Sequence, residues 1–159
     1  MAGPVAPTDV PDLMHEHPVE HHADVISVQR AAREFARGLG FPVRECIEIS
    51  IVASELASNI VKYGIRGSVR LDAVSDPEKG AGVRLTAFDR GPAFHDFDMA
   101  LRDGCDDRGP LDPATMLGRG GIGAGLGAVA RLSDELGWQP AQGGKQVWAI
   151  RYARRPKKG

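Results

Sequence analysis

Hydrophobic positions in the middle of the chain repeat with two different periods. Over residues 43–63 ("VRECIEISIVASELASNIVKY") apolar side chains recur every three or four residues, which predicts an α-helix. Residues 68–74 ("SVRLDAV") and 82–88 ("GVRLTAF") instead alternate apolar and polar side chains across the turn-forming "SDPEKGA", which predicts a β-hairpin. The two periods together indicate a domain that mixes helices with an antiparallel sheet.

Elements of the same two kinds are predicted upstream of residue 43. "MHEHPVEHH" fits a first strand at the edge of the sheet, where Pro18 is tolerated because an edge residue needs no ladder N–H. A helix is expected from Ala23 to Leu39, with Gly40 as its stop signal. Gly64 has the corresponding place after the second helix.

The C-terminal third is predicted to end in a helix and a strand. "AVARLSDELGW" (128–138) has apolar residues at helical spacing, so we expect a third helix there, with Leu136 on its buried face. A turn at "QPAQGGK" and a last strand at "QVWAIRY" (146–152) follow. The residues between Asp89 and the glycines at 118 are long, rich in Pro, Gly and Asp and weakly periodic, which is typical of a lid or binding loop.

These elements predict an α+β fold: a two-layer α/β sandwich with a mostly antiparallel sheet and two or three helices on one face. Residues 15–153 would form the single domain. The proline-rich residues 1–14 have little to bury and are expected to be a disordered leader, and residues 154–159 a basic tail.

Composition narrows the function classes. Lys plus Arg number 20 against 21 Asp plus Glu, so the net charge of −1 gives no general attraction to nucleic acid or an anionic membrane. Two cysteines, Cys46 and Cys105, are too few for a disulfide framework, and neither a signal peptide nor a long apolar run occurs. We therefore expect a cytoplasmic protein whose partners are recognised locally.

Polar residues in the second helix give the first chemical clue. On a helical wheel centred on Leu56, the buried stripe consists of Ile49, Val52, Ala53, Ile60 and Tyr63. Glu55 and Asn59, four residues apart, lie together on one shoulder of that stripe, where we expect half-buried side chains. A carboxylate and an amide there could meet a hydrated cation and a phosphate; the alternative is a helix boundary satisfied by water.

Asp89 is the second clue. Period two places it on the same face of its strand as Val83, Leu85 and Ala87, so it continues an inward apolar row. A buried carboxylate needs a donor, which a ligand amine could supply. The alternative is an aspartate that ends the strand and caps the turn at Arg90-Gly91-Pro92.

The third clue is "GRGGIGAGLG", residues 118–127. It matches G-x-G-x-x-G, but no buried strand precedes it, and it lacks the Gly-Lys-Ser/Thr of a Walker motif. Glycines that lead into a helix committed to the core present free backbone N–H groups to an anion. This favours a phosphate cradle over a flexible linker.

As a set, the three clues resemble the motifs of the GHKL ATPases, the superfamily of gyrase, heat-shock chaperone, histidine kinase and mismatch-repair ATPase domains. "ELASNIVKYG" is similar to the N box, "DRGP" to the first glycine box and "GRGGIGAGLGAVARLSDEL" to the second. Within the superfamily the chain resembles the small bacterial anti-sigma and switch kinases of the RsbT type over residues 25–151. The resemblance implies the Bergerat ATP-binding fold.

The resemblance also implies roles for individual residues. Asn59 would bind Mg²⁺, Glu55 would be the catalytic residue that orients or deprotonates the nucleophile, and Asp89 would accept from the adenine amino group of ATP. Gly91 would let the backbone pass close to the base, and residues 95–120 would form the ATP lid. The triphosphate would be lined by the second glycine box: Gly120, Gly121, Gly123, Gly125 and Leu126.

Partners follow from the same resemblance. The implied activity is a serine/threonine kinase that phosphorylates a STAS-domain antagonist in bacterial stress or sigma-factor signalling, with a sigma factor or a PP2C-type phosphatase as further partners. Neither nucleic acid nor a membrane is expected, and a homodimer stays open. The competing hypothesis is a non-catalytic, nucleotide-responsive module that sequesters a sigma factor or activates a phosphatase.

Two positions depart from the RsbT pattern. Ala93 stands where the first glycine box ends in a second glycine, which would alter the contact with the nucleotide. The lid is longer and, at "GPLDPATML", resembles that of the RsbW-like anti-sigma kinases. For the γ-phosphate the sequence offers four candidate cations: Lys62, Arg90, Arg108 and Arg119.

Overall fold

The computed structural model describes residues 14–63, 65–101, 105–106, 109–110 and 125–153. Its helices are α1 (His22–Gly38), α2 (Val43–Tyr63), α3 (Phe97–Ala100) and α5 (Leu126–Leu132). Its strands are β1 (Met14–Val19), β2 (Gly67–Asp76), β3 (Gly80–Asp89), β4 (Cys105–Asp106), β5 (Gly109–Pro110), β6 (Glu135–Ala141) and β7 (Gly144–Tyr152). None of the helices within these ranges is both long and apolar enough to span a bilayer.

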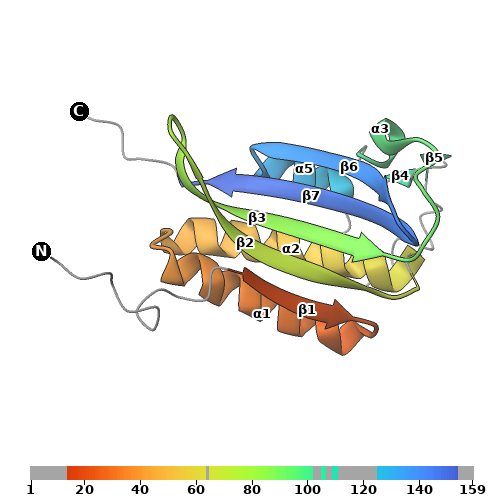
Figure 1. The fold of residues 1–159 in the computed structure, drawn as a ribbon, viewed down its shortest axis with the longest axis horizontal. Coiled ribbons are helices and arrows are strands. Elements are labelled where there is room, and N and C mark those ends of the chain that lie inside the picture. Colours follow the sequence, from red (N-terminus) through yellow and green to blue (C-terminus); the bar gives the residue numbers. More distant parts are fainter. Residues whose placement is uncertain (1–13, 64, 102–104, 107–108, 111–124, 154–159) are drawn as a thin grey trace, which may run out of the picture.

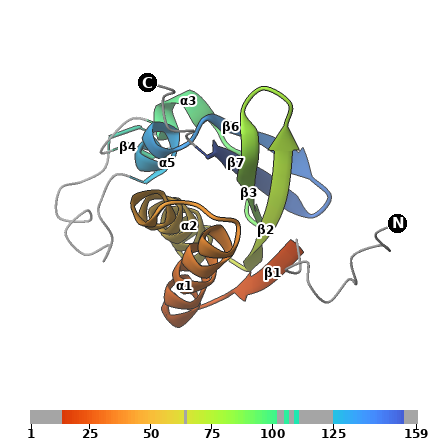
Figure 2. The ribbon, with the colours of Figure 1, turned by 90° about the vertical axis from the view of Figure 1, so that its left-hand side faces the viewer.

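Five strands form one antiparallel sheet in the order β1-β2-β3-β7-β6 (Figure 1), and β4 pairs only with β5. Helices α1, α2 and α5 lie on one face of the sheet, as the end-on view in Figure 2 shows. The predicted two-layer α+β sandwich is therefore confirmed. β1 is an edge strand and the hairpin is β2-β3, both as expected.

The core lies between α2 and the inward rows of the central strands. As predicted, Val83, Leu85 and Ala87 of β3 are buried, and so is most of the α2 stripe: Ile49, Val52, Ala53, Leu56 and Ile60. Each large aliphatic side chain withdrawn from water in this way contributes about 1.5–3 kcal/mol. Tyr63 was expected in the stripe but is 41% exposed, and it is the last residue of the helix.

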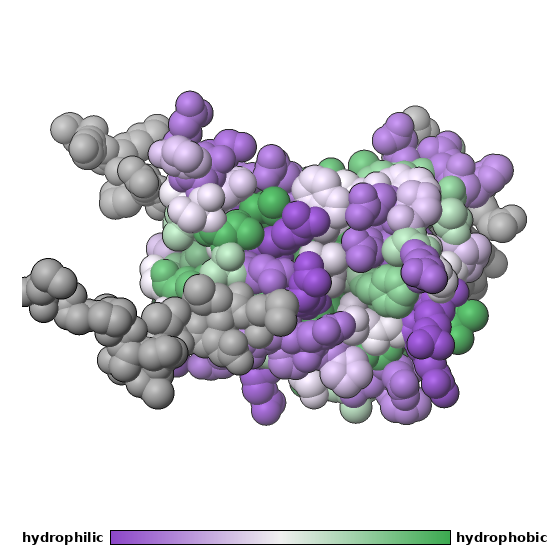
Figure 3. Space-filling model, viewed as in Figure 1, coloured by the Kyte–Doolittle hydropathy of each residue, from purple (hydrophilic) through white to green (hydrophobic). Residues whose placement is uncertain are grey.

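None of the described helices lies on the opposite face of the sheet, where the coloured surface in Figure 3 is largely hydrophilic with scattered apolar patches. Arg70 pairs with Asp72 along β2, and the Arg84 guanidinium lies 5.0 Å from the centre of the Trp148 ring on β7. Long polar side chains thus cover the aromatic residues on this face.

The predicted third helix is wrong beyond Leu132. Ser133 is already extended (φ −119°, ψ 150°), and Glu135–Ala141 forms β6. Leu136 pairs with Ala149 in the sheet, and a Cβ on Gly137 would lie 2.4 Å from the Trp148 ring. The apolar residues of "LSDELGW" fit both a helical spacing and the two-residue alternation of a strand. Pairing with β7 makes the segment from Glu135 a strand.

The β6–β7 connection is also shorter than predicted. The strands run up to Ala141 and from Gly144, and Gly143 has a φ of +78° that favours glycine. The other helix ends agree with the sequence: Gly40, at φ +88°, follows α1, and α2 ends at Tyr63. The expected leader was residues 1–14, but Met14 already belongs to β1. Residues 1–13 of that leader, Gly64, residues 111–124 and the basic tail (154–159) lie outside the described residues, so those expectations remain predictions.

Candidate functional site

Glu55 lies deeper in the protein than the sequence indicated. It is 6% exposed on α2, not half-buried, and its carboxylate accepts a hydrogen bond from the backbone N–H of Gly125. Burial raises the pKa of this carboxyl group above its ordinary value, while the nearby Lys62 charge and the Gly125 bond act in the opposite direction. The fold thus brings the carboxylate of the second helix to the end of the glycine run.

Asn59 is half-buried one turn after Glu55, as predicted. Its amide and the Glu55 carboxylate therefore share the edge of α2 that faces the start of α5. Among the described residues no group of three or more His, Cys, Asp and Glu side chains could hold a metal ion. Asn59 offers an amide oxygen, a ligand type that suits a hard cation such as Mg²⁺.

Only the last part of the predicted glycine cradle can be placed. Gly125 precedes α5 with φ 54° and ψ −135°, a conformation that favours glycine, and Leu126 begins the helix with its side chain buried in the core. Gly120, Gly121 and Gly123 lie outside the described residues, as do Arg108 and Arg119. The described part shows how the run ends: its last glycine donates its N–H to Glu55.

Asp89 is buried on the inward face of β3, as the alternation predicted. Its Oδ1 accepts from the backbone N–H of Gly91 at 2.7 Å, which is the turn-capping bond of the structural alternative. The same oxygen accepts from Nζ of Lys145 at 2.8 Å. The donor expected from a ligand is thus supplied within the protein by a lysine.

Lys145 was missed by the sequence analysis. It was assigned to a turn, whereas the structure places it in β7 directly opposite Asp89. A signal was present in the sequence, because Lys145, Val147 and Ala149 share one face once β7 is extended by two residues. The four cations considered for the γ-phosphate did not include it.

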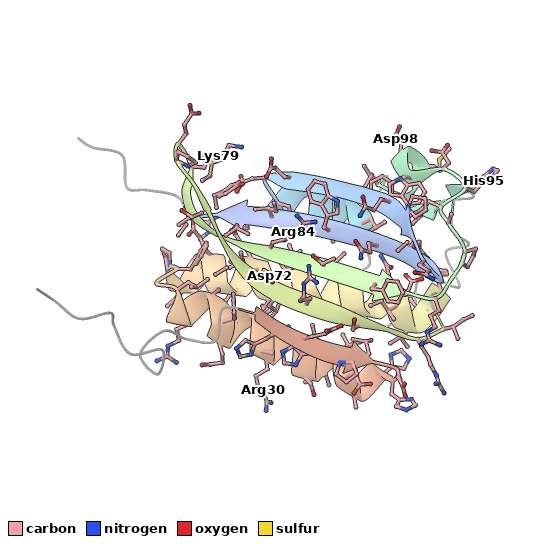
Figure 4. The ribbon with its side chains drawn as sticks, in the orientation of Figure 1. Arg30, Asp72, Lys79, Arg84, His95 and Asp98 are labelled. Atoms are coloured by element: carbon pink, nitrogen blue, oxygen red, sulfur yellow. The ribbon has the colours of Figure 1, made fainter. Side chains whose placement is uncertain are left out.

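Both parts of the site lie at the same end of the molecule (Figure 1). Gly67, which follows α2, pairs with Asp89, and a Cβ on Gly67 would lie 3.0 Å from the Ile60 side chain. The C-terminal turns of α2 therefore adjoin the end of β3, where "DRGP" begins. His95 marks the segment after β3 at this end in Figure 4, and Lys79 marks the opposite end.

Comparison with known proteins decides the family. The histidine kinase-like ATPase domain matches residues 20–151, which include Glu55, Asn59, Asp89 and the glycine run. The chain belongs to this family. The serine/threonine-protein kinase RsbT of Bacillus subtilis (strain 168) is 32% identical over 132 residues, covering 82% of this chain and 90% of RsbT.

Solved structures agree on the fold of this histidine kinase-like domain. The RsbU and RsbW domains of Rv1364c from Mycobacterium tuberculosis match 92% of this chain and 34% of that longer chain, with a TM-score of 0.58 and 17% identity. The SiaB-SiaC complex from Pseudomonas aeruginosa matches 87% of this chain and 88% of the matched chain, again with a TM-score of 0.58 and 17% identity. At this identity the two structures support the architecture alone.

Proposed function

We propose that the protein is an ATP- and Mg²⁺-dependent serine/threonine kinase that phosphorylates a STAS-domain antagonist in a bacterial partner switch. The observation that carries this proposal is the buried Glu55 carboxylate, held by the Gly125 N–H at the end of the glycine run. The similarity to RsbT, a serine/threonine-protein kinase, supports the activity, and the SiaB-SiaC complex supports a partner protein.

Each predicted site residue has a role in this proposal. Asn59 holds Mg²⁺ through its amide oxygen, and Asp89 accepts from the adenine amino group. Gly91 and Leu126 border the nucleotide, while the second glycine box donates backbone N–H groups to the phosphates. The described residues fit these groups chemically: they offer a buried acceptor for the base and oxygen ligands for a hard cation. Bound Mg²⁺ supplies positive charge that offsets the charge developing on the transferred phosphoryl group.

Glu55 acts as the base in the transfer step. Its ionised carboxylate accepts the proton of the acceptor serine or threonine hydroxyl as that oxygen bonds to the γ-phosphorus and ADP leaves. A carboxylate whose pKa burial has raised is a stronger base than an exposed one. Gly125 keeps the carboxylate oriented through its N–H.

Phosphotransfer to a cognate STAS-domain protein tests the kinase. The purified chain with labelled ATP and Mg²⁺ is expected to label that protein. Glu55→Gln should lower the rate at least about 100-fold without loss of partner binding, as expected for removal of a general base. Asn59→Ala should abolish Mg²⁺-dependent nucleotide binding in calorimetry. A wild-type protein that binds its partner but transfers no phosphate would rule out the kinase.

One observation favours a second candidate function. The Asp89 carboxylate is already engaged by Lys145, so the base-binding position is closed in this structure. This arrangement supports a non-catalytic module that binds a sigma factor or a PP2C-type phosphatase and uses nucleotide only to change shape. Partner binding that changes with ATP, in the absence of any phosphotransfer, would select this candidate. A cytoplasmic location and a homodimer are compatible with both candidates and remain predictions.

A further inference from the structure

Lys145 is a buried cation at the start of the inward row of β7. It shares the inward face of β7 with Val147 and Ala149, and only 6% of the residue is exposed. Lysine is rarely buried to this extent unless its ammonium group is paired, because removing that charge from water is costly. The burial of Lys145 therefore requires partners for its ammonium group.

The ammonium group of Lys145 has two partners, a carboxylate and an aromatic ring. Asp89 Oδ1 lies 2.8 Å from Nζ, and the two residues are direct partners in the β3–β7 ladder. The ring centre of Phe94 lies 5.2 Å from Nζ, within the range of a cation–π contact. The two backbones approach closely here, since a Cβ on Gly144 would lie 1.8 Å from the Asp89 carbonyl oxygen.

Aromatic rings cover this ion pair. Phe94 packs edge-to-face on Phe97 of α3 at 5.0 Å and on Trp138 of β6 at 5.1 Å. The Lys145 and Asp89 side chains are each 8% exposed in consequence. An adenine amino group that approaches Oδ1 of Asp89 therefore meets an ammonium group that is already bound there.

We infer that Lys145 is an internal ligand of Asp89, and that it competes with the adenine amino group for this carboxylate. The inference rests on the proposed nucleotide site and adds a regulatory residue to it. In the closed state Lys145 satisfies Asp89 in place of a nucleotide. ATP binds only by displacing the ammonium group from a buried ion pair, which lowers the apparent affinity for ATP.

Competition and simple attraction predict opposite changes in ATP affinity when Lys145 is removed. If Lys145 attracted the anionic triphosphate or donated to the base, its removal would weaken ATP binding. If it competes for Asp89, its removal leaves a buried carboxylate without its ammonium partner, and the adenine amino group then restores a hydrogen bond. The sign of the affinity change therefore separates the two mechanisms.

The test is calorimetric titration of Lys145→Met with ATP and Mg²⁺, compared with the wild type. We expect ATP to bind at least about tenfold more tightly to the variant, as regained pairing of a buried group implies. Inosine triphosphate, which lacks the amino donor, should gain less than about threefold, because it cannot restore that pairing. Lys79→Met is the matched control: it removes the same charge from the half-exposed hairpin end opposite the site (Figure 4) and should leave ATP affinity unchanged.

Lys145→Gln is a second variant, to be used in case Lys145→Met does not fold. Its amide can still donate to Asp89 but carries no charge, so ATP affinity should again rise, by a smaller factor. Circular dichroism checks that each variant is folded. Unchanged or weaker ATP binding by the folded variants, or an equal gain in affinity for inosine triphosphate, would overturn the inference. If the wild type still binds ATP, the proposed nucleotide site stands in that case. Failure of the wild type and both variants to bind any nucleotide would overturn the proposed site as well.

Discussion

Strand β7 carries a buried cation near each end, and the two are held differently. Lys145, at the start of the strand, pairs with Asp89 of the neighbouring strand and is covered by Phe94. Arg151, at the other end, reaches across to the helical layer. Its Nη2 donates to Glu48 of α2 and lies 3.9 Å from Glu45, and its Nη1 donates to the Leu132 carbonyl at the end of α5.

Arg151 links the sheet to the helical layer, whereas Lys145 forms an ion pair within the sheet. Arg151 connects β7, α2 and α5 through the several donors of its guanidinium group, so its contacts hold the sheet against the helices. Lys145 offers one compact ammonium group to one carboxylate in the same sheet. We expect the Arg151 cluster to contribute more to stability, and the Lys145 pair to have more influence on ligand binding.

The largest expected effect is that of Arg151→Met. Removing the guanidinium leaves Glu45 and Glu48 close together without their common cation, and Glu45 is 7% exposed. Breaking a buried pair in this way destabilises a protein by about 3–5 kcal/mol. Urea denaturation measures the loss. A loss below about 1 kcal/mol, within the range of surface pairs, would contradict the assigned role.

Asp89→Asn is expected to have a smaller effect on stability. The amide oxygen introduced by this substitution can still accept from Gly91 and Lys145, but the attraction between two full charges is lost. We expect the free energy of unfolding to fall by about 1–3 kcal/mol. ATP affinity should fall at least about tenfold, since a charged acceptor is exchanged for a neutral one. Equal losses of stability with and without nucleotide would instead indicate a purely structural aspartate.

Much of this arrangement follows from sequence patterns that stay local. The period of α2 and the alternation of β3 place Asn59 and Asp89 as the structure has them, because both patterns are set by consecutive residues of one element. Glu55 has the expected place on α2 but is buried more deeply than expected. The chain length and the antiparallel hairpin then suffice for the two-layer fold. The resemblance to the GHKL motifs gave the family, which the match over residues 20–151 confirms.

The sequence analysis did not predict contacts between segments that are distant along the chain. Lys145 lies 56 residues from Asp89 along the chain, and Arg151 lies 103 from Glu48, so no local period couples them. The sequence analysis assigned the first residues of β6 to a helix. The contacts that make them a strand, the pairing with β7 and the Trp148 ring over Gly137, are tertiary contacts that a local pattern does not show. Gly125, which acts on the Glu55 carboxylate, is likewise distant in the sequence and precedes another helix, α5.

Glu55→Gln tests a buried carboxylate of the same helix, for which we propose a chemical role. Burial raises the pKa of Glu55, so its contribution to stability is fully present below its ordinary value of 4.5 and is lost as pH rises through the folded-state pKa. The variant should therefore be more stable than the wild type at pH 8, by about 1 kcal/mol for each unit of pKa elevation. Near pH 4 the difference should vanish. Thermal unfolding across this pH range measures it, and a variant less stable at pH 8 would contradict the sign.

Arg44→Met gives the smallest expected effect and isolates burial as the variable. Arg44 pairs with Glu48, the same carboxylate that Arg151 binds, at 3.4 Å, but its side chain is 91% exposed. An exposed i,i+4 pair contributes about 0.3–0.5 kcal/mol, and a cation in the first turn of α2 opposes the helix dipole by a similar amount. The two terms offset each other, so the free energy of unfolding should change by less than about 0.5 kcal/mol in urea denaturation. A loss approaching that of Arg151→Met would mean that Glu48, rather than the buried guanidinium, is what holds the two layers together.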